Sequence, residues 1–235
     1  MTILGHKPNA TAWVGIFIVG FFVFLAIFAP WLAPFSQAET VGDTWAPASA
    51  TSWFGTDQIG RDLLSRIIYG ARMTIGIALA TTVLSFLIGT TLGLLASTGG
   101  NVIDQILSRI VDVMLSIPLL VFALIILSMF GSSIPTLIIT IAVLDSTRVF
   151  RLARAVSMNI AVLEYVEAAK LRGEGLWWVM TKEVLPNVLP PMISEFGLRF
   201  CFVFLTISSL SFLGLGIQPP TADWGSMVRD NAALI

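Results

Sequence analysis

Residues 164–191 read EYVEAAKLRGEGLWWVMTKEVLPNVLPP, a charged stretch broken by glycine in a chain that is otherwise mostly apolar. Within it, Glu167-Ala168-Ala169 is followed by three residues, then Gly173, then eleven residues, then Leu185-Pro186. Glycine permits a tight turn, and proline is tolerated in the first turn of a helix. The spacing therefore predicts a short helix, a turn and a second short helix.

The small and cyclic residues of this stretch have expected conformational roles. Ala168 and Ala169 keep the first helix slim enough to enter a groove on a partner. Gly173 and Gly175 permit the positive φ that re-aims the chain. The prolines are expected to stop the second helix and start the next one: Pro186, Pro190 and Pro191. A lone Glu-Ala-Ala also fits an ordinary linker, so the interpretation depends on the full spacing between two apolar segments.

The composition is that of a membrane protein. The chain is 56% hydrophobic and 11% charged, with a mean hydropathy of +0.90, whereas soluble domains are about 25% charged. The net charge of −1 gives no indication of nucleic-acid binding. The single cysteine, Cys201, excludes an intramolecular disulfide framework. The single histidine, His6, precedes the first apolar run, so we expect no histidine-based active site or metal site in the membrane region.

Apolar segments occur at lengths that can cross a bilayer, for which about 20 residues suffice. The first is interpreted as an uncleaved anchor because it is long for a signal peptide and lacks a clean cleavage site. None alternates polar and apolar residues, which excludes a membrane-spanning β-barrel. The predicted fold is all-α, a polytopic transmembrane helical bundle. Its five expected spans are Trp13–Ala29, Met73–Ala96, Ile106–Phe130, a short one from near Pro135 into Arg148, and Pro191–Gly216.

The distribution of Lys and Arg predicts the orientation, since positively charged loops stay cytoplasmic. Residues 148–190 hold six Lys or Arg, whereas residues 35–72 hold three, against four acidic residues. Lys7 adds to the side of the basic loop if the spans alternate. We therefore expect the N-terminus and the Glu167 loop to be cytoplasmic, and residues 35–72 to be external. Residues 217–235, too polar and short to cross again, are expected outside.

The external loop contains a predicted amphipathic helix just before the second span. Leu63, Leu64, Ile67 and Ile68 alternate with Arg61, Asp62, Ser65 and Arg66, a pattern that favours a helix resting in the membrane interface. Trp45, Trp53 and Phe54 precede it and are typical of an interfacial aromatic belt. Membrane anchoring is the simpler interpretation, and a docking surface for an external protein is the alternative.

Charged residues in or near the spans are expensive and often functional. Helical spacing pairs Arg109 with Asp112, and Glu195 with Arg199, in what we interpret as structural pairs. Trp177 and Trp178 are adjacent and cannot share a helix face, so one is expected to anchor at the headgroups and the other to pack on a partner. Asp145 interrupts the fourth span, and Arg148 lies three residues on. If Asp145 and Arg148 face a pore, this pair would gate or line the pathway.

Catalytic machinery is not expected in this chain. There is no GxxxxGK[ST] phosphate loop and no candidate catalytic triad or paired acid and base, so no catalytic residue is proposed. If the protein uses ATP, hydrolysis must occur on another subunit. We therefore interpret the chain as a non-enzymatic membrane subunit that binds no cofactor itself, with ATP and Mg²⁺ on partner subunits.

The spacing from Glu167 to Pro186 resembles the cytoplasmic EAA loop of permease subunits in bacterial binding-protein-dependent ABC importers. Further motifs are similar to the second permease subunit of the dipeptide, oligopeptide and nickel branch. These motifs lie in the external loop and near the C-terminus: Phe54–Asp57, Gly60–Arg66, Tyr69–Arg72, Leu210–Gly216, Pro219-Pro220 and Asp223–Gly225. The chain departs from the pattern in two respects: an expected sixth span is missing, and Glu183 replaces an often apolar residue.

The resemblance implies an ABC importer type I permease fold in the bacterial inner membrane. It implies residues 1–72 as an anchor span with its external loop, and residues 73–235 as the permease core with a cytoplasmic coupling loop at 148–190. The residues implied to couple to the ATPase are Glu167, Ala168, Ala169, Gly173, Leu185 and Pro186. Glu167 would pair with a cation on the ATPase, and Gly173 would set the angle of the loop.

The implied partners are a homologous second permease, two ATPase subunits, an external solute-binding protein and the lipid bilayer, with no nucleic acid. The expected cargo is a dipeptide or oligopeptide. Nickel or another small solute is the alternative within the same machinery. Two other classes remain, an autonomous channel or secondary transporter and a non-transporting membrane scaffold. A channel predicts an internal repeat of spans, which the sequence does not display, and a scaffold leaves the motif spacing without a reason.

Overall fold

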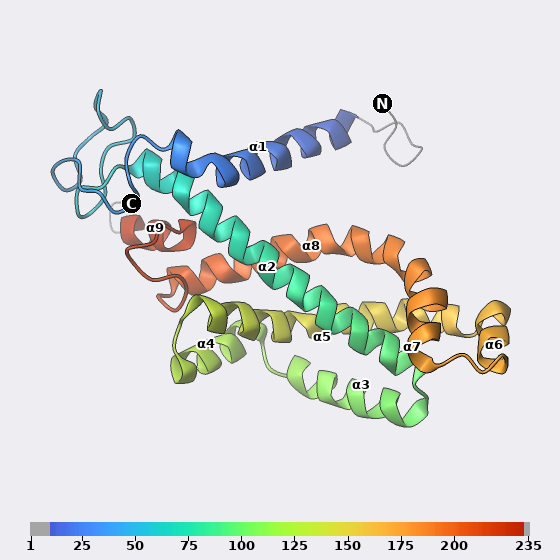
Figure 1. Cartoon of the computed structure of the whole chain (residues 1–235). Helices are drawn as coiled ribbons and strands as arrows, with labels where there is room; N and C mark the ends of the chain where they lie inside the picture. The colour runs from blue at the N-terminus through green and yellow to red at the C-terminus, as the bar shows by residue number, and fades with distance from the viewer. Residues whose placement is uncertain (1–9, 233–235) are drawn as a thin grey trace. The chain divides into compact units, whose positions relative to one another are not determined.

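The computed structural model describes residues 10–232, and this part of the chain is built from helices (Figure 1). His6 and Lys7 lie outside the described residues. Strand-like pairing within 10–232 is limited to isolated bridges in the loop after the first helix. The predicted all-α class is confirmed. The helices are α1 (Ala10–Leu32), α2 (Leu63–Thr98), α3 (Asn101–Leu115), α4 (Leu119–Phe130), α5 (Ile134–Ala161), α6 (Glu164–Leu171), α7 (Leu176–Trp178), the π-helical η1 (Val179–Val184), α8 (Leu185–Phe212) and α9 (Trp224–Asn231).

The chain divides into two compact units. The first comprises residues 1–77 and 211–235, and the second comprises residues 78–210. The chain passes from one unit to the other within α2 and again at the end of α8. The second unit contains the predicted coupling residues and the Asp145–Arg148 pair.

Fewer helices have the length and composition of a membrane span than the sequence predicted. Three qualify within the described residues: Ala10–Leu32, Leu63–Thr98 and the continuous helix Leu176–Phe212. A fourth candidate is α3 with α4, which are bent by 86° at their junction. Helix α5 does not qualify, and its second half carries Asp145 and a series of arginines. The predicted count of five spans is therefore not confirmed.

The expected span Ile106–Phe130 is not one straight helix, because the chain bends between α3 and α4. The break has a local cause at Pro118, which has φ −55° and ψ 129° and precedes the first residue of α4. Proline disfavours the helical conformation in the residue before it, here Ile117. Helix α3 therefore ends at Leu115, and α4 starts in a new direction.

Two other helix ends differ from the prediction. Helix α5 continues beyond Arg148 to Ala161, so the basic segment begins as helix. The predicted stop at Pro190 and Pro191 is wrong, since both lie inside α8. A proline in a helix removes one hydrogen bond and bends the helix, but it need not end it where packing holds both sides. Here the flanking Val188 and Met192 are both buried, which is the packing that holds both sides. The bend is visible in Figure 1, where the ribbon turns between α7 and the body of α8.

The core of the second unit joins the long helices to the short elements of the Glu167 stretch. Its buried members come from α2, α5, α6, η1 and α8: Leu94, Val149, Ala153, Ile160, Val166, Ala169, Val179, Met180, Val184, Val188 and Met192. Because one cluster contains residues of all these elements, α6 and η1 are packed parts of the unit.

Helix α2 approaches α5 closely through Gly89 and Gly93. A Cβ atom on Gly89 would lie 2.6 Å from the Ser146 carbonyl oxygen, and one on Gly93 would lie 2.7 Å from the Ala153 Cβ. Both distances are shorter than real Cβ contacts, so neither position accommodates a larger residue without movement. Gly-x-x-x-Gly is a common pattern where membrane helices pack backbone to backbone. Gly89 and Gly93 show this pattern in the sequence.

In the first unit, the predicted amphipathic helix is not a separate helix at the membrane interface but the first turns of α2. The polar residues of this segment are buried. Asp57 forms ion pairs with Arg61 at 2.7 Å and Arg66 at 3.3 Å, all three being at most 4% exposed. Asp62 accepts hydrogen bonds from the Ser65 hydroxyl at 2.6 Å and backbone amide at 2.8 Å. The polar face therefore ties the loop of residues 33–62 to the start of α2.

Helix α9 is fixed to the same unit by the Asp223-Trp224 pair. The Asp223 carboxylate accepts hydrogen bonds from the Ser226 amide at 2.8 Å and from the Thr74 hydroxyl at 3.1 Å. The Trp224 indole N–H donates to the carbonyl of Ile67 at 2.9 Å. These bonds cap α9 and hold it against the first half of α2.

Candidate functional site

The Glu167 stretch forms an elbow, which we define as residues 164–190: α6, a turn, and the start of a long helix. The turn closes α6 with a Schellman arrangement. The Glu174 amide donates to the Ala169 carbonyl at 3.3 Å, and the Gly173 amide donates to the Lys170 carbonyl at 3.0 Å. These bonds satisfy carbonyls that the helix end would leave open. The turn is therefore a defined structure.

Of the two glycines expected to take positive φ, only Gly173 does so. Its φ is +85°, whereas Gly175 has φ −68° and ψ 157°, an extended conformation open to any residue. Gly175 instead stands as the N-cap of α7. The prediction for Gly173 is confirmed and that for Gly175 is wrong, because the Schellman arrangement needs one left-handed residue.

The inner face of α6 packs on the long helix. Val166 and Ala169 are fully buried in the core cluster beside Val179 and Val184 of η1. Asn187 adds a polar contact by donating to the Tyr165 hydroxyl at 3.0 Å. Ala169 therefore contacts its own chain, and of the two alanines only the exposed Ala168 is open to a partner.

The outer face of α6 is open and carries negative charge at its start. Glu164, Glu167, Ala168 and Lys170 are exposed, and Leu171 is 82% exposed. No ion pair of Glu167 or Glu164 occurs among the described residues. Two free carboxylates near a helix N-terminus, next to an exposed leucine, suit a partner with a cationic rim and an apolar groove.

The other two predicted coupling residues lie where the elbow becomes the long helix. Leu185 is half-buried against the core cluster, and Pro186 is exposed. From Leu176 to Phe212 the helix is continuous over 37 residues. Glu183, the departure noted in the sequence, lies 3.9 Å from Arg172 and so forms a loose ion pair across the elbow. The elbow thus passes directly into an apolar, span-length helix.

Trp177 and Trp178 have different environments, as their adjacent positions in the helix predicted. Trp178 packs against the core cluster of the chain, and Trp177 is 69% exposed. The half-buried Trp178 therefore packs within its own chain. Its exposed neighbour is the one open to headgroups or to a partner.

A second candidate site surrounds Asp145, which is 1% exposed. Its carboxylate lies 3.6 Å from the Arg148 guanidinium and 3.9 Å from that of Arg199 on α8. The Ser85 hydroxyl of α2 donates to it at 3.0 Å. The predicted Asp145–Arg148 contact is confirmed, and the sequence did not indicate Ser85 or Arg199 as further partners. Three helices therefore meet at one buried carboxylate.

Arg199 also has its predicted helical partner. Its Nε donates to Glu195 at 2.6 Å, and its guanidinium carbon lies 5.0 Å from the centre of the Phe202 ring. Glu195 and Phe202 hold the cation on α8 beside Asp145. The two carboxylates and two guanidinium groups of this cluster carry equal and opposite charge.

Two arginines of α5 form ion pairs with aspartates of α3. One of these ion pairs differs from the prediction. Asp112 does not pair with Arg109 but with Arg151, whose Nη2 donates at 2.7 Å. Asp104 accepts two hydrogen bonds from Arg154. The missed signal is the three-residue spacing of Arg148, Arg151 and Arg154, which places them along one side of α5. Helix α3 is thus held by charges on a second element, and spacing within one helix cannot reveal that.

Comparison with known proteins gives matches along nearly the whole chain. Residues 89–235 match the family described as "Binding-protein-dependent transport system inner membrane component". Residues 7–47 match "N-terminal TM domain of oligopeptide transport permease C". The first match contains the elbow and Asp145 with Arg148 and Arg199, and the second contains α1.

Curated relatives and a solved structure agree with these matches. A dipeptide transport system permease protein of Alkalihalophilus pseudofirmus is 38% identical over 230 residues, which covers 97% of this chain and 76% of the relative. A di/tripeptide transport system permease protein of Pseudomonas aeruginosa is 38% identical over 227 residues, covering 94% and 75%. The crystal structure of an amino acid ABC transporter with histidines matches at 22% identity with a TM-score of 0.51, covering 73% of this chain and 79% of that one. At that identity the structure supports the fold alone.

Proposed function

This chain belongs to the binding-protein-dependent transport system inner membrane component family, and we propose that it is a permease subunit of an ATP-driven importer for dipeptides or oligopeptides. The peptide cargo rests on the two relatives named above, which are 38% identical and are peptide permeases. The observation that carries the mechanism is the continuity of the elbow with the span-length helix Leu176–Phe212. A force on the elbow reaches the membrane without an intervening loop.

The elbow is the proposed contact with an ATPase subunit. Glu167 would pair with a cation of that subunit, Ala168 would allow close approach, and the neighbouring exposed Leu171 would fill an apolar groove. Gly173, Leu185 and Pro186 would set the angle between α6 and the long helix. The burial of Val166 and Ala169 against η1 supports this arrangement, because it lets the elbow move as one rigid part. ATP and Mg²⁺ would be held and used on the ATPase.

Transport would then follow alternating access. ATP-driven closure of two ATPase subunits would move the elbow, and α8 would tilt with it. The Asp145 cluster is the proposed internal connection, because Arg199 of α8 meets Asp145 of α5 and Ser85 of α2 there. A second, homologous permease would complete the pathway between the two chains. Arg148, 42% exposed on its side chain, is the cluster member best placed to respond to the contents of that pathway.

The proposed orientation places the elbow and the N-terminus in the cytoplasm of a bacterial cell, on the inner face of the membrane. Residues 33–62 would then face outward, where an external binding protein delivers its cargo. The buried ionic network of Asp57, Arg61 and Arg66 supports an ordered external surface of this kind. A disordered loop would offer no fixed docking surface.

The test is uptake into vesicles. The permease is reconstituted with its second permease and ATPases, and uptake of a labelled dipeptide is measured with the binding protein outside and ATP inside. ATP-dependent uptake is expected for the full complex and none for this chain alone. Uptake of Ni²⁺ but not of peptide would assign the other cargo of the branch. Uptake by this chain without ATPases would overturn the proposal in favour of a channel or secondary transporter.

A further inference from the structure

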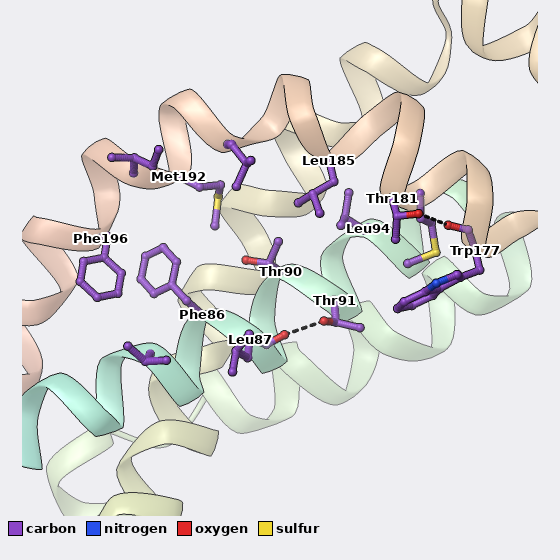
Figure 2. Close-up of a pocket in the computed structure, with 14 residues that line it drawn as sticks. Phe86, Leu87, Thr90, Thr91, Leu94, Trp177, Thr181, Leu185, Met192 and Phe196 are labelled. Carbon is purple, nitrogen blue, oxygen red and sulfur yellow. Dashed lines mark hydrogen bonds between the residues drawn. The ribbon is translucent and has the colours of Figure 1, made fainter. Parts of the chain in front are cut away.

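A groove runs between α2 and the helix that leaves the elbow, inside the second unit (Figure 2). Its volume is about 520 Å³, within the range of about 300–1,000 Å³ typical of small-molecule sites. The lining residues are uncharged: Val83, Phe86, Leu87, Thr90, Thr91, Leu94, Trp177, Met180, Thr181, Leu185, Leu189, Met192, Ile193 and Phe196.

The groove offers little to a polar ligand. The Thr91 hydroxyl donates to the carbonyl of Leu87 at 2.7 Å, and the Thr181 hydroxyl donates to that of Trp177 at 2.8 Å, as Figure 2 shows. These two hydroxyl donors are therefore already used within their own helices, which leaves the Thr90 hydroxyl as the third one on the lining. Sites for polar solutes present several convergent polar groups, whereas the groove is lined mainly by hydrocarbon side chains. A zwitterionic peptide would lose its hydration there without replacement.

The length of the groove corresponds to one leaflet of a bilayer. Its lining on α2 extends from Val83 to Leu94, a distance of about 16 Å at the rise of an α-helix. Half of the hydrocarbon thickness of a bilayer is about 15 Å. One end is closed by the Phe86 and Phe196 rings, whose centres lie 5.0 Å apart. At the other end stands the indole of Trp177.

The walls of the groove continue into the apolar outer surface of two span-length helices. Leu87 on α2 is 62% exposed and Ile193 on α8 is 69% exposed, and both border the groove. At the Trp177 end, Thr181 is followed directly by Lys182, which is exposed and enters no ion pair within the described part of the chain. Tryptophan and lysine are the residues that commonly mark the headgroup level of a membrane.

We propose that this groove holds one acyl chain of an anionic phospholipid from the leaflet on the elbow side. The hydrocarbon would lie along Val83–Leu94, and Lys182 would attract the phosphate. A transmembrane helix of the second permease would compete for the same apolar face, and cross-linking distinguishes the two occupants.

An acyl chain at this position would lie between the outer edges of α2 and of the helix that transmits motion from the elbow. Met180 and Leu185 belong both to the groove and to the surroundings of the core cluster. This consequence rests on the proposed function, whereas lipid binding itself does not. Lipid composition would then change how tightly ATP hydrolysis is coupled to uptake.

The test uses the assembled complex in vesicles of phosphatidylethanolamine and phosphatidylglycerol, with a trace of phosphatidylglycerol that carries a photoreactive group in its acyl chain. Adducts are mapped by mass spectrometry. We expect them within residues 83–94 and 185–193. In Leu189→Trp, which fills the groove, adducts at 83–94 should fall about tenfold, the factor that corresponds to about 1.4 kcal/mol. Leu205→Trp, at another exposed position on α8 that does not line the groove, should leave them unchanged.

Two results would overturn the proposal. One is labelling that is no stronger at the groove than at exposed Leu79 and unaffected by Leu189→Trp, which would mean ordinary boundary lipid. The other is efficient cross-linking of Leu87→Cys to the second permease in a background with Cys201→Ser, which would make the groove a subunit interface. Loss of ATP-dependent uptake with labelling retained would count against the proposed function and leave the lipid site standing.

Discussion

Asp145 on α5 and Arg199 on α8 lie 3.9 Å apart, and the same carboxylate lies 3.6 Å from Arg148, one turn along α5. One buried carboxylate is thus shared by two guanidinium groups, which lie on two helices. Both distances are longer than a hydrogen bond, while the Ser85 hydroxyl lies within hydrogen-bond distance at 3.0 Å. The cations are therefore attracted without being locked in position. A contact of this kind allows α8 to shift against α5 while the charge stays compensated.

Asp145→Asn should destabilise the permease. The amide keeps the size of the side chain and its contact with Ser85, but it leaves Arg199 and Arg148 without their shared counter-charge. Breaking a buried ion pair by neutralising one partner costs about 3–5 kcal/mol. We expect the lower part of that range because Glu195 still pairs with Arg199. The change in unfolding free energy is measured by denaturant titration in detergent.

The matched control is Asp112→Asn, which makes the same chemical change on the surface. Asp112 and its partner Arg151 have side chains 52% and 60% exposed. Exposed pairs contribute about 0–1 kcal/mol, so this variant should unfold close to wild type. Equal losses in both variants would mean that burial does not determine the importance of Asp145.

Gly173→Ala should strain the elbow turn. Its φ of +85° costs an L-residue about 1–2 kcal/mol. No atom lies within 4 Å of the added Cβ, so the cost comes from the backbone alone. Gly175→Ala is the control, since that position is equally open but has φ −68°. ATPase attachment and uptake should fall in the first variant only, as measured by copurification and vesicle transport.

Gly89→Ala and Gly76→Ala should change stability in opposite directions. At Gly89 the new methyl would meet Ser146 and Val149 at 2.6 Å, and overpacking costs about 1–3 kcal/mol. At Gly76, on the same helix, no atom lies within 4 Å, and alanine is favoured over glycine in a helix by about 0.8–1.0 kcal/mol. Melting temperatures in detergent test the pair. A neutral Gly89→Ala would show that α2 and α5 can separate freely.

The elbow was predictable because its features are local. The turn at Gly173 and the helices on either side follow from spacing and backbone chemistry. Which alanine faces inward was not predictable, since Ala169 is buried only because η1 packs on that side of α6. For the same reason Pro190 and Pro191 gave the wrong helix end: the packing of Val188 and Met192 keeps the helix going.

The charged residues show the same limit more clearly. Spacing within one helix found the contacts of Asp145 with Arg148 and of Glu195 with Arg199. It gave Asp112 the wrong partner, because Arg151 comes from another helix. At the start of α2 the burial of the polar face was missed, since the partner of Arg61 and Arg66 is Asp57 in the preceding loop. Contacts between distant segments need the fold.

Labelling of single cysteines should establish the orientation. In a Cys201→Ser background, needed because Cys201 is exposed, Glu174→Cys at the elbow should react with an impermeant maleimide only from the cytoplasm. Ser49→Cys in the loop of residues 33–62 should react only from outside. The expectation follows from the six Lys or Arg in residues 148–190 against three in residues 35–72. Reaction of both positions from one side would contradict the predicted topology.

Glu167→Lys should uncouple the permease from its ATPase without harming the permease itself. Glu167 is exposed and has no ion pair within residues 10–232, so reversing its charge breaks nothing in this chain. At an interface with a cationic partner the attraction becomes a repulsion, which costs several kcal/mol when both charges lose water. Membrane insertion and melting temperature should match wild type, while ATP-dependent uptake and copurified ATPase should fall at least tenfold, equivalent to about 1.4 kcal/mol. Glu174→Lys makes the same change past the turn and should retain most uptake. A compensating acidic substitution on the ATPase should restore the Glu167→Lys complex, and unchanged uptake by Glu167→Lys alone would remove this residue from the coupling site.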